Sequence, residues 1–505
     1  MLTKILSCAV IGLDGEAINI EVDVSPGYPK FIMVGLPDKA IDESRQRIPT
    51  AIRNAGFEYP YTKKIVVNLA PADLRKEGAA FDLPIAAGIL ASSGEIHGSM
   101  EDSVFVGELA LDGSLRSTRG ILPIAIWARE KKYKRIFVPR VNADEASVIK
   151  DVDVIPINTL GQLVRFLNSE EAINPHVAVL TNHHEQYENQ VDMSHIIGQE
   201  QAKRALEVSA SGAHNISMSG PPGSGKTLLA RAIPSILPQM ELDEQLEVTK
   251  IYSIADRLNS NTPLITTRPF RSPHHTASGV SLVGGGAFPR PGEISLAHRG
   301  VLFLDEFPEF SRTVLENLRQ PLEDGVVTVS RAQGSITFPA RFVLVASQNP
   351  CPCGYLGDPD KSCVCNQAQI VRYRGKISGP IIDRIDLHVE VPRLPFEKLQ
   401  NSKPSESSEV IRERVNRARA RQYKRLQKYK LFTNSEMTAN IVKQVCRLDS
   451  QTQQLIRQAV IQLHLSARAF HRILKIARTI ADLDEQDEIA STHVAEALQY
   501  RPKTE

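Results

Sequence analysis

The sequence predicts an α/β protein in which a phosphate-binding core is preceded by an α+β domain and followed by helices. Strand and helix patterns alternate through residues 1–170 and resume at residue 195. A glycine-rich loop, GPPGSGKT, joins a strand to a helix in the second region, and the chain after residue 409 has helical spacing. The expected domains are 1–170 (α+β), 171–194 (a polar linker), 195–396 (the core) and 397–505 (helical).

Composition places the chain among globular proteins. Of 505 residues, 42% are hydrophobic and 23% are charged, and this length suggests several domains. The net charge of +2 neither requires nor excludes nucleic acid. Residues 5–13 faintly resemble a signal sequence, but acidic residues follow without a cleavage site, so we expect a buried first strand. We expect a cytoplasmic protein without a membrane span, in which clustered cysteines indicate metal rather than disulfides.

In the N-terminal domain, short β-rich runs alternate with helical spacing. The linker has no such periodicity, and its His183 and His184 are interpreted as solvated residues rather than ligands. The expected elements are strands at 20–25, 31–35 and 63–70, helices at 39–56 and 81–94, a strand-rich unit at 103–115, and a helix followed by a strand within 121–139.

The glycine-rich loop is typical of a nucleotide-phosphate site. Glycines let backbone N–H groups turn toward phosphate oxygens at a helix N-terminus, and the strand–loop–helix context is present. Lys226 would add charge near the β- and γ-phosphates, and the Thr227 hydroxyl would bind Mg²⁺. The predicted phosphate-binding residues are Gly220, Pro221, Pro222, Gly223, Ser224, Gly225, Lys226 and Thr227.

Two adjacent acids follow a buried strand in GVLFLDEF. We expect Asp305 to hold Mg²⁺ and Glu306 to orient the attacking water. The alternative is a pair of acids favoured by a helix dipole. Further along the chain, a third apolar strand ends at Asn349, Arg384 precedes another strand, and Arg468 lies at a helix start. Each of these three alone is as consistent with a surface role as with catalysis, so their order carries the argument.

That order resembles the AAA+ ATPases, and RPFRSPHHTASGVSLVGGG (268–286) and PRPGEISLAHRGVLFLDEFPEF (289–310) resemble the ComM/YifB family, which is magnesium chelatase-like. The resemblance extends over essentially the whole chain. It implies that Asn349 is a sensor for the lytic water, that Arg384 is an arginine finger acting on a neighbouring subunit, and that Arg468 is a second sensor in a helical lid. Ile197 and Gly198 would border the adenine.

The family's implied activity is a hexameric, ATP- and Mg²⁺-dependent DNA helicase that drives branch migration in homologous recombination during natural transformation. Partners would be DNA, further copies of the chain and recombination proteins, without a membrane. Residues 279–293 resemble a helix-2 insert, and 326–342 are predicted to form a hairpin. Arg331 at its tip and Arg290 are candidate DNA contacts, although a solvated role is equally consistent for each. His274 and His275 are interpreted as structural residues.

Residues 76–86 and 107–128 resemble the Lon-type proteolytic domain. The positions of the serine nucleophile and lysine base fall on Ala80 and Leu122, which cannot perform those roles. The resemblance therefore implies an inactive protease-like domain that serves as a platform for ring assembly or DNA.

Four of the six cysteines lie in the stretch between Asn349 and Arg384. Cys351, Cys353, Cys363 and Cys365 form two C-x-C pairs that suit a structural Zn²⁺, while free thiols or a disulfide pair remain alternatives. Cys8 and Cys446 are expected to be buried hydrophobes.

Two other functions remain open: a chelatase-type motor and a protein-remodelling ATPase without a DNA role. Residues 411–430 carry nine basic residues and one acid, which fits either a solvated helix face or a contact with a phosphate backbone.

Overall fold

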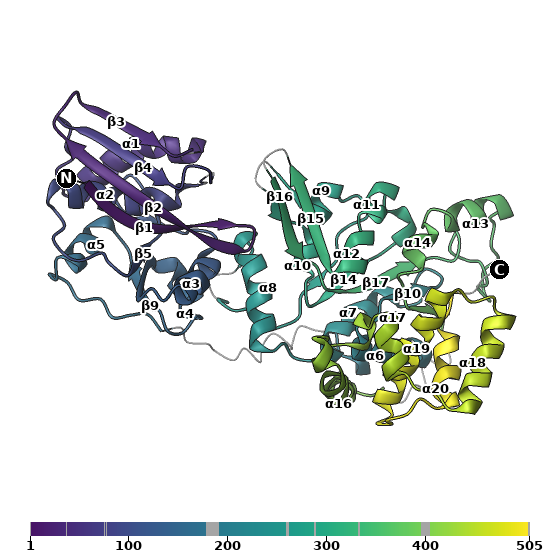
Figure 1. Ribbon diagram of the computed structural model, residues 1–505. Helices are drawn as coiled ribbons and strands as arrows, with labels where there is room; N and C mark the ends of the chain where they lie inside the picture. Colours follow the sequence, from purple (N-terminus) through teal and green to yellow (C-terminus); the bar gives the residue numbers. More distant parts are fainter. Residues whose placement is uncertain are drawn as a thin grey trace. The chain divides into compact units, whose positions relative to one another are not determined.

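The computed structural model describes residues 2–36, 38–74, 76, 78–177, 191–258, 262–286, 289–331, 334–394 and 405–502. Contacts divide the chain into two compact units, coloured along the sequence in Figure 1. The first unit comprises Met1–Asn182 with Gln245–Ile265, and the second His183–Glu244 with Thr266–Glu505. Residues 245–265, which we expected in the core, thus belong with the N-terminal unit, and the C-terminal helices form one unit with the core.

The described part of the first unit contains a four-stranded sheet, a three-stranded sheet and the short antiparallel pair β6–β7. In the first sheet the order is β1-β2-β4-β3, with only the β3–β4 pair parallel. Alternate residues of β2 are buried, and α2, buried for most of its length, packs on that sheet. The second sheet is parallel, in the order β5-β8-β9. The elements are β1 (Leu2–Ile11), β2 (Asp14–Ser25), β3 (Lys30–Val34), α1 (Lys39–Asn54), β4 (Lys64–Ala70), α2 (Asp82–Ser93), β5 (Ser103–Phe105), β6 (Glu108–Leu109), β7 (Leu115–Arg116), α3 (Ile121–Glu130), β8 (Arg135–Pro139), α4 (Ala143–Ser147), β9 (Asp153–Ile157) and α5 (Leu160–Leu167).

Helix α8 (Leu242–Ile254) begins in the second unit and continues into the first. Leu246 packs against the apolar cluster around α3, and Ser253 Oγ donates a hydrogen bond of 2.6 Å to Glu145 Oε1. Arg119 forms an ion pair of 2.9 Å with Asp256 just beyond the helix. These contacts explain why the segment groups with the N-terminal unit.

The second unit contains a five-stranded parallel sheet in the order β11-β14-β17-β10-β18. All four residues of β14 are buried, as expected for a parallel strand covered on both faces. Because the strands are parallel, the carboxyl ends of β10, β14 and β17 meet at one edge. The sheet and the helices beside it comprise α6 (Glu200–Gly212), β10 (Ile216–Ser219), α7 (Lys226–Ile236), β11 (Phe270–Arg271), β14 (Val301–Leu304), β17 (Val343–Gln348) and β18 (Leu387–Glu390).

The expected hairpin is present as β15 (Val326–Arg331) paired with β16 (Gly334–Pro339). In the described part of the chain, no helix is long and apolar enough to cross a membrane. The remaining elements of this unit are α9 (Gly279–Val283), β12 (Gly284–Gly285), β13 (Arg290–Pro291), α10 (Glu293–Leu296), α11 (Arg312–Glu316), α12 (Arg319–Asp324), α13 (Gln367–Arg374), α14 (Gly379–Ile382), α16 (Ser408–Leu426), α17 (Ala439–Val445), α18 (Ser450–Gln462), α19 (Ala467–Leu483) and α20 (Ser491–Gln499).

Candidate active site

The loop between β10 and α7 forms a phosphate cradle. Gly223 and Gly225 have φ angles of 77° and 91°, which favour glycine. A Cβ on Gly220 would lie 2.1 Å from the Val391 carbonyl oxygen, so this position requires glycine for close approach. The loop leads into the N-terminus of α7, where free N–H groups and the helix dipole attract anions.

Lys226 lies in this loop with its ammonium close to three oxygens. Nζ donates to the carbonyls of Gly220 (2.7 Å) and Pro221 (2.9 Å), and it lies 3.3 Å from Asn349 Oδ1. Burial lowers the pKa of Lys226, and the charge of Asp305 partly opposes this effect. A partly desolvated cation held by neutral oxygens is well suited to receive phosphate oxygens, since charge-assisted hydrogen bonds are stronger.

Asp305 follows β14 and lies beside Thr227. The Thr227 hydroxyl donates a 3.0 Å hydrogen bond to Asp305 Oδ2, and Ser347, near the end of β17, donates to Oδ1. A hydroxyl and a carboxylate at the foot of a phosphate loop are hard oxygen donors of the kind that Mg²⁺ prefers. The donor set therefore fits the expected magnesium site at Thr227 and Asp305.

Glu306 is half-exposed and adopts a φ of 52°, and its side chain contacts a histidine. His275 Nδ1 lies 3.1 Å from Glu306 Oε2, and the His275 ring packs on His274 at a centroid distance of 4.1 Å. We interpreted both histidines as structural, so sequence reasoning missed this contact. The sequence carries no signal for this contact, because it depends on β11, the strand before His275, lying next to β14 in the sheet.

Two further predicted positions lie near the loop. The side chain of Asn349, which follows β17, faces Lys226 at the distance given above. Ile197 and Gly198 precede α6, and the neighbouring Gln199 donates to Ser224 O (3.2 Å) and Pro392 O (2.7 Å). The structure thus brings Asn349 and the 197–198 segment to the phosphate loop.

Arg384 precedes β18, so it lies where the parallel strands begin, at the end of the sheet opposite the phosphate loop. In the parallel β10–β18 pair, Ile216 faces Leu387 and Ser219 faces Glu390. The phosphate loop follows the last of these β10 residues, whereas Arg384 precedes β18. A four-residue strand spans roughly 13 Å. Arg384 is therefore separated from its own chain's phosphate loop by about the length of one strand.

Arg468 shares a partner with Arg384. Arg384 Nη2 forms an ion pair with Glu323 Oε2, and Arg468 Nη2 lies 3.8 Å from Glu323 Oε1. Both arginines therefore lie together at the edge away from the phosphate loop. This placement separates them from Asn349, with which the sequence grouped them.

The four clustered cysteines converge in space. Their Sγ atoms all lie within 4.8 Å of one another, and three of the pairs are separated by 3.4–3.6 Å. Four thiolates about 2.3 Å from a Zn²⁺ at tetrahedral angles would be about 3.8 Å apart. The donor set therefore fits a zinc ion held by Cys351, Cys353, Cys363 and Cys365.

This cysteine loop packs against the phosphate loop. Gly354 has a φ of 86°, and a Cβ there would lie 2.6 Å from Pro222 Cδ and 3.8 Å from Asn349 Cγ. The cysteine loop thus packs against the turn that cradles phosphate and lies near the expected sensor amide.

The predicted DNA contacts and the two positions aligned with a proteolytic dyad come from other segments of the chain. Arg290 is exposed in β13, and Arg331 ends β15 with a side chain outside the described residues. In the first unit, Leu122 is buried and Ala80 packs on the same apolar cluster. Near them, burial raises the pKa of Glu145, whose carboxylate accepts from the Leu122 N–H at 2.9 Å. Both positions that the resemblance aligns with a proteolytic dyad therefore carry alkyl side chains in an apolar setting.

The basic helix α16 is largely engaged within its own unit. Its arginines pair with acids of α6, of the segment before α16 and of the region around the end of α19, which weighs against a free track for phosphates. Burial lowers the pKa of Arg419 to about 9. The pairs are Arg414 with Glu207 and Glu406, Arg417 with Glu485, Arg421 with Asp487, and Arg425 with Asp482.

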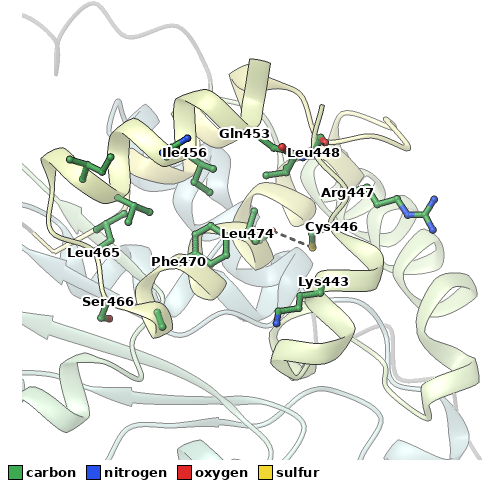
Figure 2. Close-up of a pocket in the computed structure, with 14 residues that line it drawn as sticks. Lys443, Cys446, Arg447, Leu448, Gln453, Ile456, Leu465, Ser466, Phe470 and Leu474 are labelled. Atoms are coloured by element: carbon green, nitrogen blue, oxygen red, sulfur yellow. Dashed lines mark hydrogen bonds between the residues drawn. The ribbon is translucent and has the colours of Figure 1, made fainter. Parts of the chain in front are cut away.

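A separate pocket of about 910 Å³ lies among α17, α18 and α19 (Figure 2). Leu474, Phe470 and Ile456 form an apolar part of its wall, and Lys443 lies on its rim. Cys446, buried as expected, donates to Leu474 O at 3.7 Å. The residues of the phosphate loop do not line this pocket, so it is distinct from the nucleotide site.

Three family models match the chain along most of its length. These are Magnesium chelatase, subunit ChlI (residues 192–399), Subunit ChlI of Mg-chelatase (20–142) and Magnesium chelatase, subunit ChlI C-terminal (405–501). Together with the parallel sheet, the phosphate loop and the acids after β14, they define a magnesium chelatase-like AAA+ protein of the α/β class.

Relatives that match over nearly the whole chain identify the family within this class. Competence protein ComM of Haemophilus influenzae is 45% identical over 506 residues, covering 99% of this chain and 97% of the relative. YifB of Escherichia coli is 44% identical, covering 98% and 96%. Magnesium-chelatase subunit ChlI of Olisthodiscus luteus is 30% identical over only 31% of this chain and 49% of the relative. The chain belongs to the ComM/YifB family, which confirms the resemblance. That family suggests ATPase activity and implies ATP and Mg²⁺.

Proposed function

We propose that this protein is a ring-forming, cytoplasmic ATPase that translocates on DNA and drives branch migration in homologous recombination, as part of natural transformation. The observation that carries the proposal is the separation of Arg384 and Arg468 from their own phosphate loop. Arginines that stabilise transition-state charge must touch the γ-phosphate. Two arginines at the far edge of the sheet can do so only in a second copy of the chain, and repetition of that contact generates a ring.

Within each site, the residues divide the work. The glycine-rich loop and Lys226 bind the phosphates, while Thr227 and Asp305 would hold Mg²⁺, which would supply neutralising charge for phosphoryl transfer. Glu306 orients and polarises the attacking water, and Asn349 positions it. His275 holds the Glu306 carboxylate at a defined place through the 3.1 Å contact. Zn²⁺ at the four cysteines fixes the loop that supports Pro222.

DNA is the proposed track. The β15–β16 hairpin, with Arg331 at its tip, and the 279–293 insert with Arg290 provide the contacts, and hexamers are the proposed assembly. In support, the 45%-identical relative is named as a competence protein. A chelatase-type or other protein-remodelling motor is the alternative. The family models and the internal pairing of the α16 arginines favour that alternative.

A mixing experiment tests the proposed action in a neighbouring copy. Arg384→Ala subunits should assemble but hydrolyse ATP slowly. Adding Lys226→Ala subunits, which lack a working phosphate loop but keep Arg384, should restore hydrolysis. Lys226→Ala subunits that also carry Arg384→Ala are the matched control and should restore nothing. Absence of rescue by the first mixture would argue that Arg384 acts within its own chain or not at all.

A further inference from the structure

Glu323, whose carboxylate pairs with both arginines, lies near the end of α12, directly before the β15–β16 hairpin. Only Asp324 and Gly325 separate it from Val326, the first residue of β15 (Figure 1). Neither the motifs nor the family resemblance assigned it a role. Its position joins two features that the proposed function keeps separate, the arginines that act on ATP and the hairpin that contacts DNA.

The ion pairs at Glu323 hold both arginines. The Arg384 side chain is only 8% exposed, and its Nη1 also donates to Pro380 O at 2.6 Å. The hydrogen bond from Arg384 and the charges of Arg384, Arg468 and Arg319 lower the pKa of Glu323. The carboxylate is therefore ionised at neutral pH, so it competes with any other anion for these two guanidinium groups.

The joint between α12 and the hairpin is tight. Gly325 has a φ of 68°, its N–H donates to Pro321 O at 3.0 Å, and its carbonyl accepts from the Ala340 N–H at 2.8 Å. Both ends of the hairpin are thereby fastened to the end of α12. Gln320 Nε2 adds a contact of 3.3 Å to Thr328 Oγ1 on β15. A displacement of α12 therefore displaces the base of the hairpin.

We propose that Glu323 is a positioning residue that couples ATP in a neighbouring copy to the β15–β16 hairpin by exchanging Arg384 and Arg468 with that copy's γ-phosphate. The inference rests on the proposed action of these arginines between copies. Guanidinium groups pair well with phosphate, which carries more charge than a carboxylate, so a γ-phosphate competes effectively for both. In addition, Arg384 Nε is buried and has no hydrogen-bond partner among the described residues, so it retains a donor for a phosphate oxygen.

The exchange has a mechanical consequence. When both arginines bind the phosphate, Glu323 loses the two ion pairs that join α12 to the segment after α14 and to the start of α19. When phosphate leaves, the arginines return to Glu323 and α12 regains that attachment. The base of the hairpin thus occupies one position before hydrolysis and another after it.

Hydrogen–deuterium exchange of peptides covering residues 326–339 tests the coupling without DNA. The Glu306→Gln background holds ATP in place, and exchange is compared with and without ATP. We expect ATP to change the exchange of these peptides by at least about threefold. Glu323→Gln, which removes the charge and keeps the shape, should abolish that change. Glu485→Gln is the matched control, because the Glu485 side chain is about as exposed as that of Glu323 (57% against 52%) and pairs with Arg417 elsewhere in the unit.

Activity provides the second readout, measured with Glu306 intact. In Glu323→Gln, the number of DNA strands displaced per ATP hydrolysed should fall at least about fivefold relative to the parent. Glu323→Asp, which restores the charge on a shorter side chain, should recover part of the coupling. Any of three results would overturn the proposal. The hairpin could be insensitive to ATP, Glu323→Gln could behave like the parent, or Glu323→Gln could lose stability and all activity equally.

The two proposals fail in different ways. An ATPase indifferent to DNA whose hairpin still responds to ATP would refute the DNA role and leave the coupling intact. Stimulation by DNA with a hairpin that ignores ATP would refute the coupling and leave the DNA role intact.

Discussion

Replacing Gly354 with alanine tests whether the cysteine loop supports the phosphate loop. The new Cβ would lie 2.6 Å from Pro222 Cδ and 2.8 Å from Cγ. A proline ring cannot rotate away, so either the cysteine loop or the phosphate loop must shift. We expect ATP binding to weaken, because Pro222 belongs to the turn that cradles the phosphates.

Gly357→Ala in the same loop is the matched control. Gly354 and Gly357 have similar φ angles of 86° and 78°, so alanine at either position costs roughly 1–2 kcal/mol of backbone strain. A Cβ on Gly357, however, meets nothing within 4 Å. The difference between the two variants therefore isolates the contact with Pro222.

The size of that difference follows from the cost of overpacking, about 1–3 kcal/mol. Because 1.4 kcal/mol is a factor of ten, the Kd for ATP in Gly354→Ala should be about 5- to 140-fold weaker than in Gly357→Ala. Calorimetric titration with ATP and Mg²⁺ measures both constants, and melting temperatures confirm that both proteins are folded. Equal Kd values in the two folded variants would refute support of the phosphate loop by the cysteine loop.

Three further predictions concern single residues. Glu306→Gln should bind ATP but hydrolyse it at least about 100-fold more slowly, because the water loses its polarising carboxylate; near-normal turnover would remove Glu306 from that role, and Glu309→Gln serves as the nearby control. Elemental analysis should find zinc in the parent and in Cys446→Ala but not in Cys363→Ser; a parent without zinc would leave the cluster as free thiols. Burial raises the pKa of Glu145, so the stability contributed by its protonated form is present below the unfolded pKa and is lost as pH rises toward the folded pKa. The melting temperature of Glu145→Gln relative to the parent should therefore rise as pH increases above about 4.3, the ordinary pKa of Glu, and a difference that stays constant with pH would contradict this.

The phosphate loop could be predicted from sequence because its chemistry is local. Glycine spacing, Lys226 and Thr227 lie within eight consecutive residues. The acids after β14 could also be predicted from the sequence, since an apolar run followed by Asp305 and Glu306 is typical of a strand end. The α/β fold class followed from the same alternation of strands and helices, and it is confirmed.

Contacts between segments far apart in the chain could not be predicted from the sequence. Nothing in the sequence pairs Glu323 with Arg384 or His275 with Glu306, since each contact depends on the order of strands in the sheet. The sequence left open whether the basic residues of α16 face solvent or contact phosphates, and it did not reveal that several of its arginines pair with acids elsewhere in the same unit. Likewise, the grouping of residues 245–265 with the first unit depends on Glu145 and Ser253, which are far apart in the chain.

The central claim is that ATP hydrolysis here drives movement on DNA. Steady-state hydrolysis measured without DNA, with single-stranded DNA and with a synthetic four-way junction, each at low and moderate salt, tests it most directly. We predict that DNA stimulates hydrolysis and that the stimulation weakens as salt rises, because phosphate contacts release counterions. A rate indifferent to every DNA would contradict the claim and favour a motor that remodels proteins.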